Sequence, residues 1–286
     1  MAITFEQLIQ HAGNLPPMPQ VAQKVLQLIR NPETNASDMA DAIKVDQVLT
    51  GMVLRWANSA YYGLANKVST VQQAVVVLGM NNMQSLILSS SVAGFLSRPL
   101  PGYALERGEL WRHSVGVATV ARNICGTGAR QSAEETYHAG LLCDIGKLAF
   151  EMVLQREGVG RLELHRGAFV DLERSLLGVD HAALGAEMAR RWSLPEIIVN
   201  TIAFHHQPSE SGSKAPTVYA VHLADAIVTM LGWGIGIDGL LYNIDPEALK
   251  VLRIDDRKMI ELIDQASSQI KDLDQLMDFR DTSGAR

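Results

Sequence analysis

Apolar residues recur along this chain at intervals of three and four, the spacing of one face of an α-helix. Val21, Val25 and Leu28 show this spacing first, and no run of alternating Val, Ile and Thr bounded by hairpin turns interrupts it later. The pattern predicts helices at residues 4–12, 21–31, 37–44, 46–58, 70–78, 80–96, 109–124, 133–143, 147–155, 160–167, 171–177, 181–192, 195–205 and 218–231. We therefore predict an all-α protein.

Three of the predicted helices begin with the sequence of a capping box. In this motif a Ser side chain and a Glu or Gln three residues later satisfy free N–H groups of the first turn. The boxes are Ser69 with Gln72, Ser132 with Glu135, and Ser193 with Glu196. They predict helix starts directly after these serines.

Two breaks in the helical pattern divide the chain, one at residues 99–102 and one at residues 245–247. Pro99, Pro101 and Gly102 interrupt it first, so we predict a two-lobed helical bundle with lobes at 1–102 and 103–244. Residues 245–286 are predicted to form a C-terminal helix and a disordered tail. That helix has an apolar seam too short for an independent coiled coil, so we expect it to dock on the same chain. The seam consists of Met259, Ile263, Ala266, Ile270, Leu273 and Met277.

The composition is that of a globular protein and excludes several classes. Apolar residues make up 47% and charged residues 20% of the 286 residues, which excludes disordered and low-complexity chains. The 25 Lys and Arg against 31 Asp and Glu give a net charge of −6, which disfavours nucleic-acid binding. Two cysteines and a first segment without a basic stretch indicate a cytoplasmic protein. Polar residues interrupt the uncharged segment 68–97, so no membrane helix is expected.

Histidines and aspartates are the side chains best suited to carry chemistry here. Imidazole and carboxylate groups together hold divalent cations, and a bound cation lowers the pKa of its water so that hydroxide attacks a phosphoester. Such a site requires residues from several helices to converge. The candidates are His113, His138, Asp144, His181, His205, His206 and Asp225. We interpret His138, and likewise His11 and His165, as structural residues.

The segment from His138 to Lys147, His-Ala-Gly-Leu-Leu-Cys-Asp-Ile-Gly-Lys, resembles the Gly-Leu-Leu-His-Asp-Ile-Gly-Lys signature of HD-superfamily phosphohydrolases. Cys143 stands where the signature has its histidine. The resemblance implies a metal site with the ligands His113, Asp144 and Asp225. The dinuclear HD-GYP branch has further histidines, and those at matching places here are His181, His205 and His206. The Gly-Tyr-Pro signature of that branch is absent, and a polar loop starting at Gln207 takes its place.

The first lobe resembles the HDOD domain, the HD-related output domain, in the order and spacing of four segments. They are Leu15-Pro-Pro-Met-Pro19, Ile43-Lys-Val-Asp-Gln-Val-Leu49, Arg55-Trp-Ala-Asn-Ser-Ala-Tyr-Tyr-Gly63 and Ser69-Thr-Val-Gln-Gln-Ala-Val-Val-Val-Leu-Gly79. The resemblance covers residues 13–230 and implies that the second lobe is HD-domain-like. It also implies a bacterial signalling or regulatory role, generally without hydrolase activity.

For three residues of the HD-like segment, the sequence allows both a functional and a structural role. Asp144 either ligates a metal or caps the following turn, and Cys143 is either a soft ligand or a buried thiol that packs like a small apolar residue. Lys147 either contacts a phosphate or forms a salt bridge with Asp144. Because adjacent residues on a helix project about 100° apart, we expect only one of His205 and His206 to point into a site.

These observations predict a cytoplasmic bacterial signal-transduction module that acts by binding a protein or a ligand. A signalling protein is the expected partner, and neither nucleic acid nor a membrane is expected. The alternative is a metal-dependent phosphohydrolase for nucleotides or cyclic dinucleotides with a modified HD site, in which Lys147 would be catalytic. The sequence leaves the cofactor open, and the divalent cations that such a site could take are iron, manganese and zinc.

Overall fold

The computed structural model describes residues 18–31, 33–44, 46–59, 64, 66–126, 130–162, 169–237 and 243–277. Within these ranges the secondary structure is helical, with no β-strand and one isolated bridge between Leu100 and Leu105. The prediction of an all-α protein is confirmed. The predicted helix at 4–12, most of the one at 160–167 and the predicted tail after 277 lie outside the described residues, as do His11 and His165.

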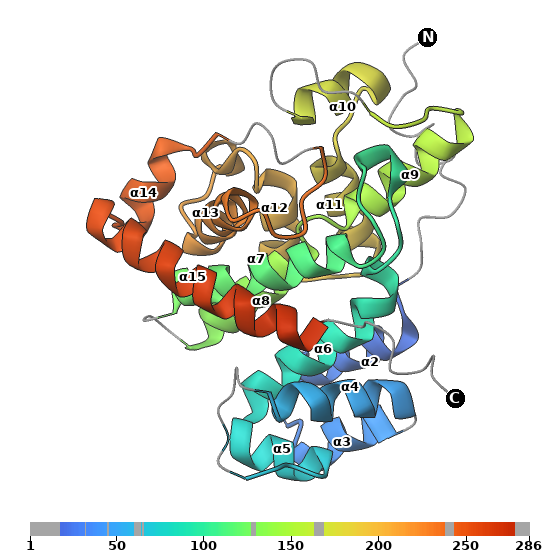
Figure 1. Ribbon diagram of the computed structural model, residues 1–286, viewed down its shortest axis with the longest axis vertical. Coiled ribbons are helices and arrows are strands. Elements are labelled where there is room, and N and C mark those ends of the chain that lie inside the picture. Colours follow the sequence, from blue (N-terminus) through green and yellow to red (C-terminus); the bar gives the residue numbers. More distant parts are fainter. Residues whose placement is uncertain are drawn as a thin grey trace. The chain divides into compact units, whose positions relative to one another are not determined.

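The chain folds as two compact units, of which the first contains the described residues from Pro19 to Ala93 and those from Gln265 onward. Its helices are α2 (Gln20–Arg30), α3 (Ala36–Lys44), α4 (Gln47–Ala57), α5 (Val71–Leu78) and most of α6 (Met80–Leu96) (Figure 1). α3 contacts α2, α4 and α5. Fully buried side chains such as Val25, Met39, Ile43 and Val53 form the core of this unit.

The predicted capping boxes are wrong in register at all three helices. α5 begins one residue late, because Thr70 accepts a hydrogen bond from the Gln73 backbone N–H (3.1 Å) and Gln73 Oε1 accepts from the Thr70 N–H (3.3 Å). α8 begins at Arg130, so Ser132 lies inside the helix. Ser193 has a positive φ of 54° and lies in the turn before Pro195, which precedes α12 without a side-chain cap.

The second unit contains the described residues from Gly94 to Asp264 and every described candidate site residue. Its helices are α7 (Glu109–Cys125), α8 (Arg130–Leu142), α9 (Gly146–Arg156), α10 (Phe169–Leu177), α11 (His181–Arg191), α12 (Glu196–Phe204), α13 (Pro216–Met230), α14 (Pro246–Leu252) and the start of α15 (Asp256–Met277). α7, α8 and α13 contact one another, and α12 contacts α8, α11 and α13. Trp111, Val115, Leu141 and Leu223 are buried in its core.

Two glycines allow α9 and α11 to cross backbone against backbone. A Cβ atom on Gly146 would overlap the carbonyl oxygen of His181 and lie 2.6 Å from the backbone nitrogen of Gly185. Only glycine fits such a crossing, because any larger residue would push the helices apart. The crossing places the turn before α9, which carries Asp144, directly beside the first residue of α11, His181.

α15 buries one side of its length. Leu262, Ala266, Ile270 and Leu273 are buried, whereas Ile260 is 62% exposed. Met259 and Ile263 are half-buried, and the side chain of Met277 lies outside what the structure describes. Ala266, Ile270 and Leu273 of the predicted seam are thus buried, and its docking on the same chain stays a prediction.

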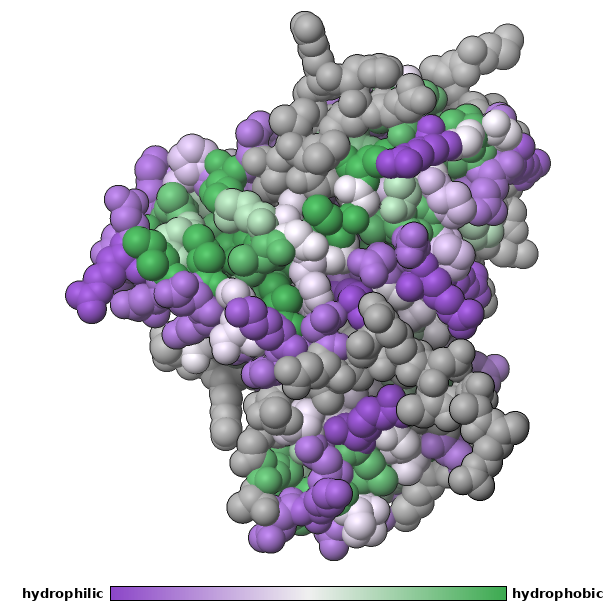
Figure 2. Space-filling view, viewed as in Figure 1, coloured by the Kyte–Doolittle hydropathy of each residue, from purple (hydrophilic) through white to green (hydrophobic). Residues whose placement is uncertain are grey.

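The surface of the second unit carries some apolar side chains. Figure 2 shows apolar side chains on the face where α13 and α14 lie. Met230, the last residue of α13, is 59% exposed. None of the helices that the structure describes is both long enough and apolar enough to cross a membrane.

Candidate metal centre

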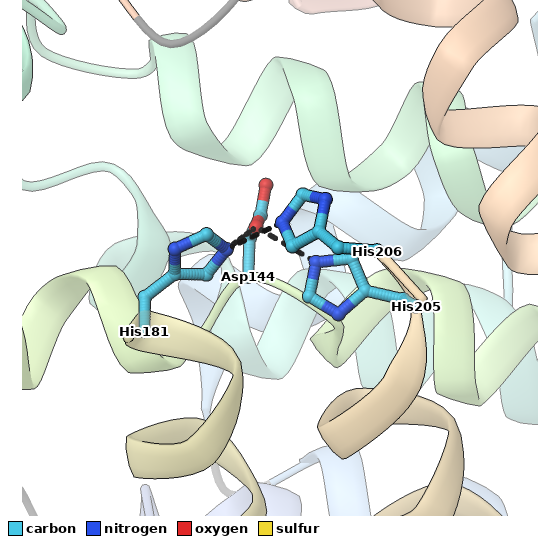
Figure 3. A group of neighbouring side chains, drawn as sticks. All are labelled: Asp144, His181, His205 and His206. Atoms are coloured by element: carbon cyan, nitrogen blue, oxygen red, sulfur yellow. Dashed lines mark hydrogen bonds and ion pairs between the residues drawn. The ribbon is translucent and has the colours of Figure 1, made fainter. Parts of the chain in front are cut away.

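Six of the residues singled out in the sequence converge in the second unit. Asp144 lies in the turn between α8 and α9, and the others come from α7, the start of α11, the turn after α12, and α13. They form two groups that share Asp144, and in each group the ligand atoms lie within 4.8 Å of one another. The first group is Asp144, His181, His205 and His206 (Figure 3), and the second is His113, Asp144 and Asp225.

Asp144 is the centre of both groups. Its Oδ1 lies 3.2 Å from His181 Nε2 and 3.6 Å from His205 Nε2, and its Oδ2 lies 2.9 Å from Lys147 Nζ. Burial alone would raise the pKa of this carboxyl, but the charge of Lys147 and the contacts with the two imidazoles hold it well below its usual range. Asp144 is therefore an ionised carboxylate, and it does not cap α9, which begins without a side-chain cap.

His205 and His206 both face the first group. α12 ends at Phe204, and the two histidines lie in the turn that follows. His205 is fully buried, and His206 Nε2 lies 2.9 Å from His181 Nε2. The prediction that only one of them points into the site is wrong, because both offer a ring nitrogen within 4.8 Å of the ligand atoms of Asp144 and His181.

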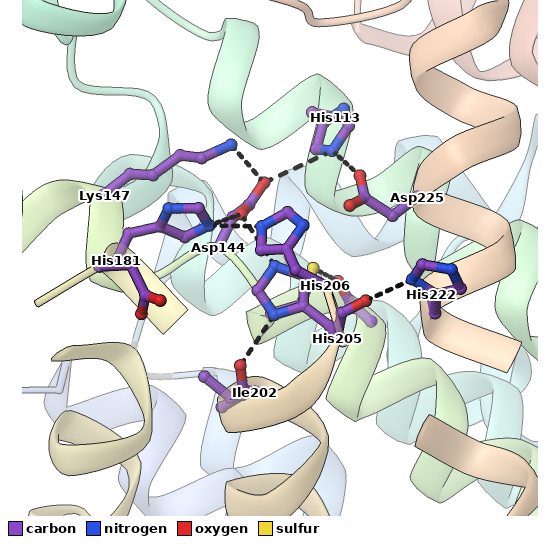
Figure 4. A network of polar contacts seen from close by, with 12 residues as sticks. His113, Asp144, Lys147, His181, Ile202, His205, His206, His222 and Asp225 are labelled. Atoms are coloured by element: carbon purple, nitrogen blue, oxygen red, sulfur yellow. Dashed lines mark hydrogen bonds and ion pairs between the residues drawn. The ribbon is translucent and has the colours of Figure 1, made fainter. Parts of the chain in front are cut away.

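The ring of His205 is oriented by its own helix. Its Nδ1–H donates to the carbonyl oxygen of Ile202 (2.8 Å), which leaves Nε2 as the atom that faces Asp144 (Figure 4). Among the described residues, neither His205 Nε2 nor Asp144 Oδ1 has a hydrogen-bond partner, although both atoms are buried. Buried atoms that can ligate and that lack a hydrogen bond need another partner, and a cation between them would supply one, so the first group fits a metal.

The second group is closed by a contact of its own. His113 Nε2 lies 2.8 Å from Asp225 Oδ1 and 3.4 Å from Asp144 Oδ2. Burial alone would lower the pKa of His113, but the hydrogen bond to Asp225 and the charges of both aspartates raise it. The nitrogen that would bind a metal here is thus already paired with a carboxylate.

Cys143 does not face either group. Cys143 follows the last residue of α8, and its Sγ donates to the carbonyl oxygen of Gly140 (3.2 Å) in the last turn of that helix. Burial, and then the charges of Asp144 and Asp225, raise the pKa of the thiol well above its usual value. Because the thiol stays protonated and packed, the geometry favours the interpretation as a buried thiol over that as a ligand.

Three further residues around the centre were missed from sequence. Glu173 Oε2 accepts a hydrogen bond from His181 Nδ1 (2.7 Å), and Glu173 Oε1 accepts one from the hydroxyl of Tyr103 (2.5 Å). His222 Nδ1–H donates to the carbonyl oxygen of His205 (2.7 Å). One signal was present: Glu173 lies on the same helix face as Phe169, Val170 and Leu177, and an acid on an apolar face indicates a buried partner.

His138 lies outside both groups. It is buried, and burial together with the nearby charge of Arg122 lowers its pKa to about 4. Its ring therefore stays neutral, as the structural interpretation from sequence requires.

Comparison with known proteins identifies relatives. The family model of the HDOD domain matches residues 15–208. A solved HDOD domain protein with unknown function from Geobacter sulfurreducens is 26% identical, covers 96% of this chain and 99% of its own, and superposes with a TM-score of 0.75.

Two other solved structures share the fold at lower identity. One from Shewanella amazonensis SB2B, named as a candidate phosphohydrolase, is 23% identical over 94% of this chain and 97% of its own, with a TM-score of 0.70. One from Marinobacter aquaeolei VT8, named as a candidate signal transduction protein, is 22% identical over 94% of this chain and 61% of its own, with a TM-score of 0.73. An uncharacterized protein of Treponema pallidum is 28% identical over 77% of this chain, which spans 44% of that relative's length.

Proposed function

The chain belongs to the HDOD domain family, and from this premise we propose that it is a cytoplasmic regulatory module of bacterial signal transduction. It acts by binding a signalling protein or a ligand, and it does not hydrolyse phosphoesters. A structural neighbour named as a candidate signal transduction protein supports the signalling role.

The observation that carries this proposal is the state of Cys143. The HD signature has a histidine at this position, next to the aspartate, and here a protonated thiol turns back to Gly140. Lys147 and His113 occupy Asp144 Oδ2, and Asp225 pairs with His113. The ligand atoms of the second group are thus paired with one another or with Lys147.

The first group would hold one divalent cation through Asp144, His181, His205 and His206. Three imidazoles and one carboxylate suit zinc, iron or manganese. A bound cation would supply a Lewis-acidic position for an anionic ligand or a water. The protein's own part is to orient the imidazoles, by contacts such as that of His205 Nδ1 with Ile202, and to exclude solvent from Asp144, which is 1% exposed.

A second candidate function is metal-dependent phosphohydrolysis. The observation that favours it is the ammonium group of Lys147, which lies 2.9 Å from Asp144 and is buried beside the first group. Such a cation could neutralise a phosphate, so Lys147 would be catalytic in this case. The fold is shared with a structure named as a candidate phosphohydrolase.

Metal content and turnover, measured on the same preparations, distinguish the two functions. The full chain is purified after growth with iron, manganese and zinc, analysed by mass spectrometry of its metals, and assayed with nucleotides and cyclic dinucleotides. We expect one cation per chain, lost in Asp144→Ala and kept in the control Asp225→Asn, whose amide oxygen still pairs with His113. We expect no turnover, also in Cys143→His.

One outcome contradicts the regulatory role without hydrolysis, and a second contradicts the cation site. Hydrolysis that disappears in Asp144→Ala would establish the phosphohydrolase instead. A wild-type protein without metal after all three growth conditions would eliminate the cation site.

A further inference from the structure

α10 places one acidic side chain completely inside the second unit. Glu173 has no exposed surface, and it shares the buried face of α10 with Phe169, Val170 and Leu177. Removing a carboxylate from water is unfavourable unless hydrogen bonds replace the lost hydration. The partners of Glu173 therefore show what this burial serves.

All the described hydrogen bonds of the Glu173 carboxylate lead to His181 or to one buried tyrosine. Oε2 accepts from His181 Nδ1 (2.7 Å) and from the His181 backbone N–H (2.9 Å). Oε1 accepts from the Tyr103 hydroxyl (2.5 Å). Glu173 thus holds both the ring and the backbone of the first residue of α11.

Tyr103 is itself fixed by packing. It is fully buried, its ring lies edge-on to Phe150 with the centroids 6.0 Å apart, and it is tilted against Phe169 at 5.4 Å. A side chain that is packed on two sides has one rotamer available, so its hydroxyl is a fixed point for the carboxylate. Tyr103 therefore orients Glu173, as Glu173 orients His181.

This arrangement decides which nitrogen of His181 faces the first group. A carboxylate can only accept, so Nδ1 of His181 carries a hydrogen and cannot ligate, and Nε2 is the nitrogen that points toward Asp144 Oδ1 (3.2 Å) and His206 Nε2 (2.9 Å). A carboxylate behind a ligating imidazole fixes its ring plane and makes the ligand atom more basic.

The next residue of α10 supports the same segments. Arg174 contacts Oδ2 of Asp180 (2.7 Å), the residue that caps α11, and its guanidinium donates to Gln207 Oε1 (3.2 Å), which follows His206 in the chain. The adjacent residues Glu173 and Arg174 thus link α10 to the two segments that carry the histidines of the first group, the start of α11 and the turn after α12.

We propose that Glu173, held by Tyr103, is a positioning residue that fixes the ring of His181 for cation binding. This inference rests on the cation site proposed above. It adds two residues, one on α10 and one in the 3₁₀ turn Pro101–Tyr103, that act through His181 without touching the cation.

The test titrates the full-length, metal-free protein with Zn²⁺ against a chromophoric chelator. We expect Glu173→Ala to weaken zinc binding by about 10- to 100-fold, the range found when such outer contacts are removed. Glu173→Gln should reduce the zinc affinity less than Glu173→Ala, because its amide oxygen still accepts from Nδ1. The zinc affinity of Tyr103→Phe should lie between those of Glu173→Gln and the wild type. The control Glu187→Gln, on the solvent side of α11, should bind like the wild type.

Proton NMR of the His181 Nδ1–H supplies a measurement that does not depend on zinc. A strong hydrogen bond to Glu173 places this signal far downfield and slows its exchange with water, and Glu173→Ala should abolish it in metal-free and zinc-loaded protein alike. If Glu173→Ala does not fold, zinc affinity and the Nδ1–H signal are compared between the wild type, Glu173→Gln and Tyr103→Phe.

The outcomes separate the two proposals. A wild-type protein that binds no Zn²⁺ overturns the cation site and the positioning role with it. A wild type that binds Zn²⁺ while the Glu173 variants bind within twofold of it overturns the positioning role alone. An Nδ1–H signal unchanged in Glu173→Ala also overturns that role.

Discussion

His181 makes contacts at both ring nitrogens, and these contacts set its charge in the metal-free protein. Burial alone would lower the pKa of this imidazole. The negative charge of Glu173 and the contacts with Asp144 and Glu173 outweigh burial and raise the pKa to about 10. His181 is therefore a cation at neutral pH when no metal is bound, and it would release a proton on binding one.

The raised pKa of His181 predicts a pH-dependent stability of the metal-free fold. Because the folded-state pKa lies above the ordinary value of 6.5, the stabilisation is complete below pH 6.5 and is lost as the pH rises through about 10. The free energy of unfolding should fall by about 1.4 kcal/mol per pH unit within this window. Urea unfolding with a chelator present, from pH 6 to pH 10, measures it. A His181→Gln variant with the same slope would contradict the assignment.

The two cysteines should differ in reactivity, because a thiol reacts as its thiolate and only when reagent reaches it. Cys143 is buried with a raised pKa, whereas Cys125 is partly exposed at the end of α7. Iodoacetamide should modify Cys125 in the native protein and both cysteines in urea, as read by peptide mass spectrometry. Rapid native modification of Cys143 would show that its turn opens.

Helix ends explain where prediction from sequence succeeded and where it failed. The spacing of apolar residues found the helices, because burial of one face depends on local pattern. The predicted capping box of α5 is one residue off because Ser69 and Thr70 are adjacent hydroxyl residues, and the Gln73 side chain accepts from the backbone of both.

The candidate site was predictable only where it matched a known motif. His113, Asp144 and Asp225 came from the resemblance, and the structure brings them together. Glu173 and Tyr103 are 70 residues apart in the chain, and no local pattern links them. Their pairing follows from the packing of α10 in the folded unit, which the sequence of either segment alone does not contain.

At the scale of elements, the crossing of α9 and α11 leads to a prediction. Gly146→Ala forces a methyl group into the backbone at His181 and should destabilise the protein by about 1–3 kcal/mol, as overpacking does, and weaken cation binding. Gly94→Ala on α6 is the control, because nothing lies within 4 Å of its added Cβ, and it should be neutral or stabilising. Thermal unfolding measures the stability of both variants, and zinc titration measures their cation binding. A Gly146→Ala variant as stable as the wild type would argue against the close crossing.

At the scale of the whole molecule, the chain returns at its C-terminal end to the unit that it builds first. The described residues from Gln265 onward belong to the same compact unit as those from Pro19 to Ala93. The limits predicted from sequence, 1–102, 103–244 and 245–286, follow the order of the chain. Composition and local pattern cannot predict that the end of α15 belongs to this unit, because an apolar seam does not specify which part of the chain it packs against.

The buried seam of α15 predicts how that part of the chain contributes to stability. Leu273→Ala removes a side chain that is 1% exposed and should cost about 2–5 kcal/mol, whereas Ile260→Ala, at 62% exposure on the same helix, should change stability by less than about 0.5 kcal/mol. Chemical unfolding of both variants measures the difference. Equal effects would mean that the seam is not docked in solution.

His222 limits which amino acids its position can accept. Its Nδ1–H donates to the carbonyl oxygen of His205 (2.7 Å), and its Nε2 accepts from the Asp245 backbone N–H (2.8 Å). Few side chains offer one donor and one acceptor at opposite ends of a rigid ring, whereas a cation accepts nitrogen, oxygen or sulfur from several residue types. In a library of variants selected for folding, residue 222 should therefore tolerate fewer replacements than the histidines that face the centre.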